Sequence, residues 1–211
     1  MIVHGSSISP FVRKVLVFAA EKGLATQHTP TGIGPKSAEF MEISPFGKIP
    51  AFEDGDYKLC DSSAIVHYID AAYPQKSLIP AEPRARGKTI WFDEYADTIM
   101  FAAFAPIFFN RVLASRIGLS VDLGAADKAE AEAVPLVLDY LETIVTDSGY
   151  LIEDRLTLAD IAVCAPLANA GFAGMVVDSA KYPRAAAYTS AILARPSFDV
   201  LIAQDRKALG L

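Results

Sequence analysis

The sequence contains little cysteine and little histidine, with two and three residues respectively in a chain of 211. Cys60 and Cys164 lie far apart and lack metal-ligand spacing, so they could form at most one disulfide bond. This usage favours a reduced compartment and predicts no metal site. His4, His28 and His67 are scattered, with no obvious carboxylate partner, and we interpret them as structural.

Blocks of like charge are also absent, and the net charge is −6 with a pI near 5.1. A nucleic-acid surface would need a basic stripe, so we expect no nucleic-acid partner. Residues 1–5 have neither the basic segment nor the apolar region of a secretory signal. The apolar stretch Phe101–Phe109 is shorter than the roughly 20 residues that span a bilayer. We therefore expect a cytoplasmic protein without a membrane partner.

What is present is the composition of an ordinary globular protein, with 52% hydrophobic and 21% charged residues. In the first eighty residues, strand patterns alternate with helical ones, and Asp54-Gly55-Asp56 is typical of a tight hairpin. This order predicts a layered α/β unit whose sheet has an antiparallel edge. The expected strands are 1–4, 27–29, 51–53 and 57–60, and the expected helices are 10–22, 37–43 and 61–73.

After a proline-rich stretch at 74–83 the strand patterns disappear. We expect Pro106 to kink the first long helix and Pro135 to interrupt the second. The predicted organisation is an α/β domain at 1–76, a linker at 77–86 and an all-helical domain at 87–211. The expected helices of the all-helical domain are 87–117, 127–147, 158–173 and 182–195. The last of them is expected to end before Pro196 and to be the final helix of the chain.

Ser9-Pro10 is a strong helix start, because serine can accept hydrogen bonds from first-turn amides and proline has no amide to lose. Most Ser-Pro pairs have only this structural role. A helix N-terminus also favours an anion, and a thiolate is such an anion.

Two further segments allow both a structural and a binding interpretation. A cis Ile49–Pro50 bond would turn the Ile49 backbone outward, free to pair with an extended peptide, although only about one X-Pro bond in twenty is cis. Asp61 and Ser62 join an expected strand to a helix and could be plain capping residues. Alternatively, Asp61 would attract an ammonium group while Ser62 and the helix amides hold a carboxylate.

Together, Ser9-Pro10-Phe11-Val12-Arg13, the segment 44–50 and the segment 59–65 resemble the N-terminal domain of cytosolic glutathione transferases. Thr157-Leu158-Ala159-Asp160 resembles the capping box of that family's buried helix, and 195–198 resembles its C-terminal segment. The resemblance covers essentially the whole chain. It implies a thioredoxin-like first domain, glutathione as co-substrate and a homodimer built across the two domains.

The same resemblance assigns Ser9 as the hydroxyl that hydrogen-bonds the glutathione sulfur, in preference to Ser7 in the same loop. Such a bond stabilises the thiolate and lowers the pKa of the thiol. Ser44 stands where the family usually has asparagine. The remaining glutathione contacts are implied to be Ile49 ahead of cis Pro50 for the cysteinyl unit, Asp61 and Ser62 for the γ-glutamyl end, and Lys48 and Lys36 for the glycyl carboxylate.

An electrophile pocket is expected between the domains, beside the first long helix. Aromatic residues at this spacing are more often simple core, and Arg111 could instead meet an acidic substrate. The candidates are Phe11, Tyr95, Phe101, Phe104, Phe108 and Arg111.

The predicted function is glutathione transfer, in which bound thiolate attacks a small hydrophobic electrophile. A glutathione-dependent isomerase, a dehalogenase or an ether-cleaving enzyme on the same fold is an alternative. The isomerase branch typically has a Ser-Ser-Cys turn, which Ser7-Ile8-Ser9 fits poorly, and a thiol transferase would need cysteine at position 9. A non-catalytic ligand- or protein-binding member is the third alternative.

Overall fold

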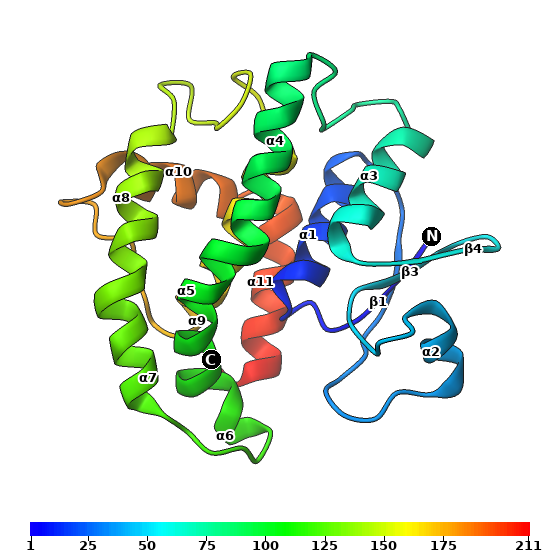
Figure 1. Cartoon of the computed structure of the whole chain (residues 1–211), viewed down its shortest axis with the longest axis horizontal. Helices are drawn as coiled ribbons and strands as arrows, with labels where there is room; N and C mark the ends of the chain where they lie inside the picture. The colour runs from blue at the N-terminus through cyan, green and yellow to red at the C-terminus, as the bar shows by residue number, and fades with distance from the viewer. The chain divides into compact units, whose positions relative to one another are not determined.

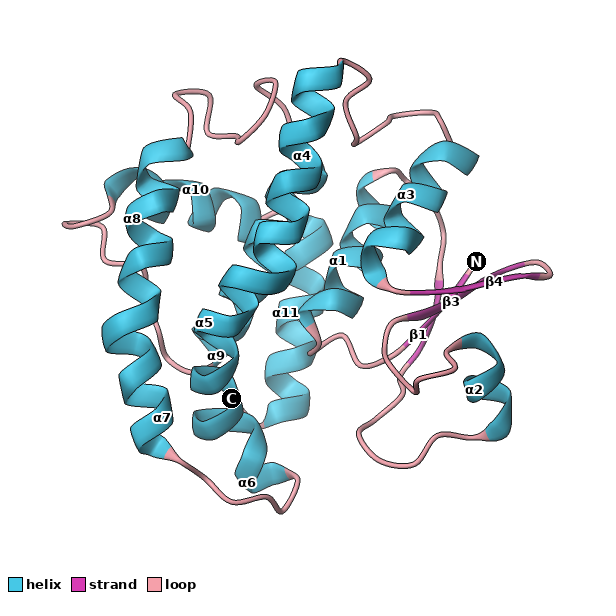
Figure 2. Ribbon diagram, in the orientation of Figure 1, coloured by secondary structure: helices cyan, strands magenta, loops and turns pink.

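The computed structural model describes all 211 residues and separates them into two compact units, Met1–Pro80 and Ala81–Leu211. The first unit contains a sheet with three helices, and the second contains helices only (Figures 1 and 2). The predicted fold class, an α/β unit followed by an all-helical one, is confirmed.

The first unit is built on a four-stranded mixed sheet with the order β2-β1-β3-β4. β1 pairs in parallel with β2, while β3 pairs antiparallel with both β1 and β4. The strands are β1 (Ile2–His4), β2 (Gln27–Thr29), β3 (Ala51–Asp54) and β4 (Tyr57–Cys60), and the helices are α1 (Pro10–Glu21), α2 (Ala38–Ile43) and α3 (Ser62–Ala72).

The predicted hairpin is present, because β3 and β4 are joined by Gly55 and Asp56. Gly55 has φ +64°, a conformation that favours glycine. The element order β-α-β-α-β-β-α was therefore readable from the sequence.

Helix α1 is the central helix of this unit. Val15, Phe18 and Ala19 are fully buried, as their helical spacing predicts, and the helix ends before Gly23 at φ +76°. At its C-terminal end the buried Lys22 ammonium contacts Asp70 of α3 at 2.8 Å. A buried cation with a hydrogen-bonded carboxylate partner avoids the cost of an unpaired charge.

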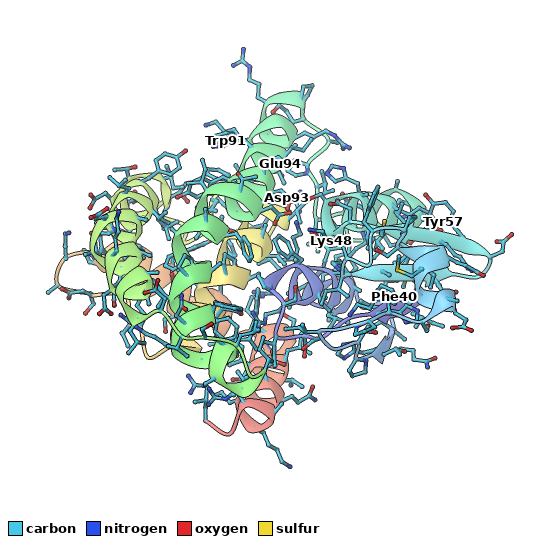
Figure 3. The ribbon with its side chains drawn as sticks, turned by 60° about the horizontal axis from the view of Figure 1, so that its bottom comes forward. Phe40, Lys48, Tyr57, Trp91, Asp93 and Glu94 are labelled. Carbon is cyan, nitrogen blue, oxygen red and sulfur yellow. The ribbon has the colours of Figure 1, made fainter.

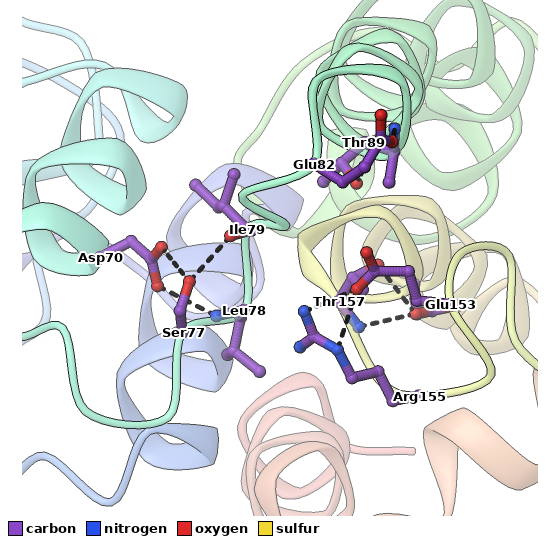
Figure 4. A network of polar contacts seen from close by, with 11 residues as sticks. Asp70, Ser77, Leu78, Ile79, Glu82, Thr89, Glu153, Arg155 and Thr157 are labelled. Atoms are coloured by element: carbon purple, nitrogen blue, oxygen red, sulfur yellow. Dashed lines mark hydrogen bonds and ion pairs between the residues drawn. The ribbon is translucent and has the colours of Figure 1, made fainter.

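Asp70 also fixes the segment that follows α3 (Figure 4). Ser77 Oγ donates to Asp70 Oδ2 at 2.7 Å, and the Leu78 amide donates to Oδ1 at 3.0 Å. Ser77 Oγ also lies 2.8 Å from the Ile79 carbonyl oxygen. One carboxylate therefore holds α1, the end of α3 and residues 77–79 together.

The second unit begins with one long helix, Pro83–Arg116. Pro106 lies inside a helical segment, and the chain remains helical on both sides of it, with π-type turns before and after. The segments are α4 (Pro83–Tyr95), η1 (Ala96–Met100), α5 (Phe101–Phe108), η2 (Phe109–Leu113) and α6 (Ala114–Arg116).

The rest of this unit surrounds α9, whose side chains are almost all buried. The predicted capping box is confirmed: Asp160 Oδ2 accepts from the Thr157 amide at 2.8 Å, and the Thr157 side chain accepts from the backbone of Asp160. The remaining segments are α7 (Leu123–Lys128), η3 (Ala129–Ala133), α8 (Val134–Ile144), α9 (Leu158–Phe172), α10 (Pro183–Leu193) and α11 (Pro196–Leu209).

The sequence missed helix α11. The prediction that the helices end before Pro196 was wrong, because Pro196 occupies the first turn of α11, where its fixed φ and missing amide cost nothing. The helix ends at Gly210 with φ +69°, and Arg116 Nε donates to the Leu209 carbonyl at 3.0 Å.

The apolar stretch Phe101–Phe109 lies within a much longer helix. Pro83–Arg116 has 34 residues and is long and apolar enough to cross a membrane by length and composition alone. In the structure it packs against α9 inside the helical unit, and 44% of its most apolar window is buried. The core helix of a helical bundle can have the same length and apolar composition as a membrane-spanning helix.

Candidate functional site

Residues 5–9 join β1 to α1 and carry the predicted catalytic serine. Gly5 has φ +134°, and a Cβ there would lie 2.6 Å from Val12 Cγ2 and 3.0 Å from Ile49 Cβ. Only glycine allows this loop to approach the loop of Ile49 so closely. Sequence reasoning missed Gly5, although a glycine between a strand and a helix start was the available sign.

Ser9 occupies the N-cap position of α1, with Pro10 in the first turn, as predicted. The expectation that its hydroxyl accepts from first-turn amides was wrong, because the side chain makes no capping hydrogen bond. The backbone alone closes the turn: the Ser9 amide donates to the Ser6 carbonyl at 3.0 Å, and the Ser9 carbonyl accepts from Arg13 at 2.9 Å. The partly buried hydroxyl is therefore not used by the helix.

The second predicted segment lies between α2 and β3. The Ile49–Pro50 bond is cis, as the resemblance implied. Ser44 is only 1% exposed, and its Oγ donates to the Lys48 carbonyl at 2.8 Å. This buried hydrogen bond fixes the conformation of the loop. The amide and carbonyl of Ile49 take part in no backbone hydrogen bond within the protein. They can pair with an extended peptide.

The third segment begins α3, where Asp61 is the N-cap. Asp61 has φ +79°, a strained conformation for a residue other than glycine, and such strain is concentrated at functional positions. Its Oδ1 accepts from the Ala64 amide at 3.0 Å, and its exposed carboxylate keeps Oδ2 available for a cation. Ser62 is buried beside it, and Lys14 Nζ donates to Ser63 Oγ at 3.1 Å.

Both lysines predicted for a carboxylate lie near Gly47. Lys48 follows Gly47 directly and is exposed. It is labelled in Figure 3. The stem of Lys36 approaches Gly47, since a Cβ on that glycine would lie 3.5 Å from Lys36 Cγ. The Lys36 ammonium donates to the Gly32 carbonyl and lies 5.7 Å from the centroid of the Phe40 ring. Lys48 is therefore the more available cation.

Two histidines have partners that the sequence did not indicate. The interpretation of His4 as lacking a carboxylate partner was wrong, because His4 Nε2 lies 2.8 Å from Glu53 Oε1 across the β1–β3 pair. His28 Nε2 lies 2.7 Å from the carbonyl oxygen of Gly5. Cross-strand proximity brings these groups together, and only the strand register reveals it.

The predicted electrophile-pocket residues of the helical unit do not gather in one place. Phe104 and Phe108 are buried in the core, where the Phe108 ring lies 6.3 Å from that of Phe172. Arg111 is held by Asp127 at 2.8 Å and by Glu130, and these hydrogen bonds raise its pKa. Carboxylates of the protein itself therefore occupy the guanidinium for which an acidic substrate was the alternative partner.

Phe101 is half-buried in α5, and Phe11 lies half-buried in the first turn of α1, in the other unit. Tyr95 lines an apolar groove of about 730 Å³ on the helical unit, and its buried hydroxyl has no hydrogen-bond partner. Burial raises the pKa of Tyr95. The groove is formed by Trp91, Tyr95, Thr98, Ile99, Ala102, Ala103, Ala133, Leu136, Val137 and Tyr140.

The chain is similar to known proteins over most of its length. The chain matches the glutathione S-transferase N-terminal domain over residues 3–77 and the C-terminal domain over residues 95–196. A glutathione S-transferase of Hyoscyamus muticus is 33% identical over 210 residues, covering 96% of this chain and 97% of the relative.

Solved structures give the same result. A glutathione S-transferase from Rhodospirillum rubrum F11 superposes with a TM-score of 0.86 at 25% identity, covering 95% of this chain and 90% of that one. Glutathione S-transferase-I bound with lactoylglutathione superposes with a TM-score of 0.83 at 25% identity, covering 96% and 98%.

Proposed function

Since the chain belongs to the glutathione S-transferase family, we propose that Ser9 activates the thiol of glutathione for attack on a small hydrophobic electrophile. The chain is a glutathione transferase, and glutathione is its co-substrate. The observation that carries the assignment of Ser9 is its hydroxyl, which stands at the start of α1 without making a capping bond.

Three groups of the same unit support the binding of the tripeptide in one orientation. The free backbone groups of Ile49 match the amide and carbonyl of the cysteinyl unit. Asp61, with Oδ2 available, matches the ammonium group of the γ-glutamyl end. The exposed ammonium of Lys48 matches the glycyl carboxylate. The resemblance adds Pro50, Ser62 and Lys36 to this set.

In the proposed reaction, the glutathione thiol loses its proton to solvent and the Ser9 hydroxyl donates a hydrogen bond to the resulting thiolate. Stabilising the charged form lowers the pKa of the thiol and raises the fraction of nucleophile at neutral pH. The sulfur then forms a bond to the electrophilic carbon, and the leaving group departs with the electron pair of its broken bond. Positioning and thiol activation supply the rate.

The test compares Ser9→Ala with Ser7→Ala, its neighbour in the same loop. We expect Ser9→Ala to lower kcat for conjugation of an aryl halide about 100-fold, while calorimetry gives a dissociation constant for glutathione within about threefold of wild type. Ser7→Ala should retain most of the activity. Equal losses in both variants, or a loss only in Ser7→Ala, would overturn the assignment of Ser9.

We further propose that the enzyme is a cytoplasmic homodimer and that a second copy covers the groove lined by Tyr95. The groove is apolar, and Leu136 on its rim is 71% exposed. An apolar patch of this kind on a soluble protein marks an interaction surface. Phe46, in the loop between α2 and β3, is 87% exposed and is a matching anchor on the partner copy. Both cysteines are free, which fits the cytoplasm.

Two substitutions test the homodimer, one in the proposed anchor and one in the groove. Phe46→Ser removes the proposed anchor and Leu136→Glu places a charge in the groove, so each should give a monomer in sedimentation velocity. Val176→Ser is the matched control, because Val176 is 84% exposed but does not line the groove. A dimer that persists in both variants contradicts this interface, and a wild-type monomer contradicts the homodimer itself.

A further inference from the structure

We propose that His28 is a positioning residue that holds the Ser9 loop in place through the carbonyl of Gly5. His28 Nε2 lies 2.7 Å from that oxygen. A carbonyl can only accept, so Nε2 must carry a hydrogen and donate it. The inference rests on the proposed function of Ser9, because it concerns how that hydroxyl is placed.

Gly5 is fixed to β2 through both of its backbone polar groups. Its amide donates to the Thr29 carbonyl at 3.0 Å, and its carbonyl accepts from His28. Val3 is the register partner of His28, so the imidazole extends along β1 to the residue that follows the strand. Gly5 lies four residues before Ser9, where the chain leaves the sheet. The hydrogen bond from His28 therefore determines the orientation of the Gly5 carbonyl at the start of the Ser9 loop.

The position of Gly5 also determines how closely two parts of the site approach. Its α-carbon packs against Ile49 and Val12 so closely that a Cβ would overlap Val12 Cγ2. Ser9 and Ile49 are the proposed contacts of one cysteinyl unit, whose sulfur and backbone have a fixed separation. A small shift of Gly5 would change the distance from the Ser9 hydroxyl to Ile49, and would so displace the hydroxyl from the sulfur of a cysteinyl unit held by Ile49. Such misplacement affects activation more than binding.

The experiment uses a pair of amide substitutions that differ in reach. Glutamine places an N–H donor close to the position of imidazole Nε2, whereas asparagine is one methylene shorter and cannot reach Gly5. We expect His28→Asn to raise the pKa of the bound glutathione thiol, measured by ultraviolet difference absorbance, by about half a unit to one unit. His28→Gln should restore the wild-type value.

Affinity for S-methylglutathione separates positioning from general damage, because this thioether has no thiol to activate. It should change less than about twofold in His28→Asn, while kcat/KM for an aryl halide at low pH falls about threefold to tenfold. His4→Asn is the matched control, since His4 is also a half-buried histidine of the sheet but bonds Glu53 rather than the loop. It should leave the thiol pKa unchanged.

The inference is overturned if His28→Asn leaves the thiol pKa at the wild-type value. It is also overturned if His28→Gln is as impaired as His28→Asn, because the imidazole would then act by packing. Ser9→Ala in the same titration keeps the two proposals distinct. If that variant does not raise the thiol pKa, the role of Ser9 fails, whatever the result at His28.

Discussion

Two helix-start residues of the α/β unit differ from two charged residues of the helical unit in how their polar groups are used. In the α/β unit, Ser9 and Asp61 stand at helix starts with hydrogen-bonding capacity that the fold does not consume. In the helical unit, Arg111 and Asp160 are held by several partners within that unit. The contrast indicates that the first unit presents groups to a ligand, whereas these residues of the second unit serve its structure.

The largest effect that tests this contrast is on stability. Asp160 Oδ1 accepts from the Leu151 amide at 2.9 Å, and Oδ2 accepts from the Thr157 amide at 2.8 Å, all within the buried core. Asp160→Ala leaves both donors unpaired, and we expect it to lower the free energy of unfolding by about 3 kcal/mol. Denaturant unfolding measures this loss. Folded Asp160→Ala should bind glutathione with wild-type affinity. Weakened binding would contradict the purely structural role of Asp160.

A substitution at Asp61 should raise stability and weaken glutathione binding, the opposite of the effects expected at Asp160. Asp61→Gly relieves a positive φ that costs roughly 1 kcal/mol, and glycine caps a helix almost as well as aspartate. We expect the free energy of unfolding to rise by about 1 kcal/mol while the dissociation constant for glutathione rises about tenfold, through loss of the ammonium partner. Thermal unfolding and calorimetry measure the two effects. A loss of stability without a loss of affinity would contradict the assignment.

Part of the fold could be predicted from the sequence. Local patterns predicted the element order of the first unit, the Ser9–Pro10 helix start and the capping box at Thr157, because each depends on neighbouring residues. Helix α11 was missed because Pro196 was interpreted as a terminator when it is a first-turn residue.

Other features depend on contacts between distant segments. The approach of Gly5 to Ile49 and the bond from His28 to Gly5 follow from strand register and loop packing, which composition does not reveal. The aromatic residues of the long helix have one periodicity, yet Phe104 is core and Tyr95 lines a groove. Helical spacing identifies a buried face without saying what buries it.

The pH dependence of stability sharpens the comparison at Asp160. Burial raises the pKa of this carboxyl to about 6, above its value in the unfolded chain. The native state therefore binds the proton more tightly, and the stability contributed by protonation is present at low pH and lost as pH rises through about 6.

Relative to Asp160→Asn, the wild type should gain about 1 kcal/mol as pH falls from about 7 to about 5. Urea unfolding of both proteins at the two pH values measures the difference. Parallel curves would mean that the carboxyl does not titrate in this window.

The smallest effect is expected at Arg111. Its ion pairs with Asp127 and Glu130 are partly exposed, so Arg111→Gln should cost less than about 1 kcal/mol. Values of kcat/KM for a neutral and for a carboxylate-bearing electrophile should both stay within about twofold of wild type. A selective loss with the acidic electrophile would show that the guanidinium leaves its carboxylates to meet the substrate.

The central claim is that Ser9 stabilises the thiolate of bound glutathione, and titration of that thiol tests it most directly. Ultraviolet difference absorbance across pH gives the pKa of the bound thiol in wild type and in Ser9→Ala. We predict a wild-type pKa at least about one unit below the usual thiol value of ~8.5, with Ser9→Ala returning toward that value. Bound glutathione whose thiol titrates at the same pH in both proteins would contradict the claim.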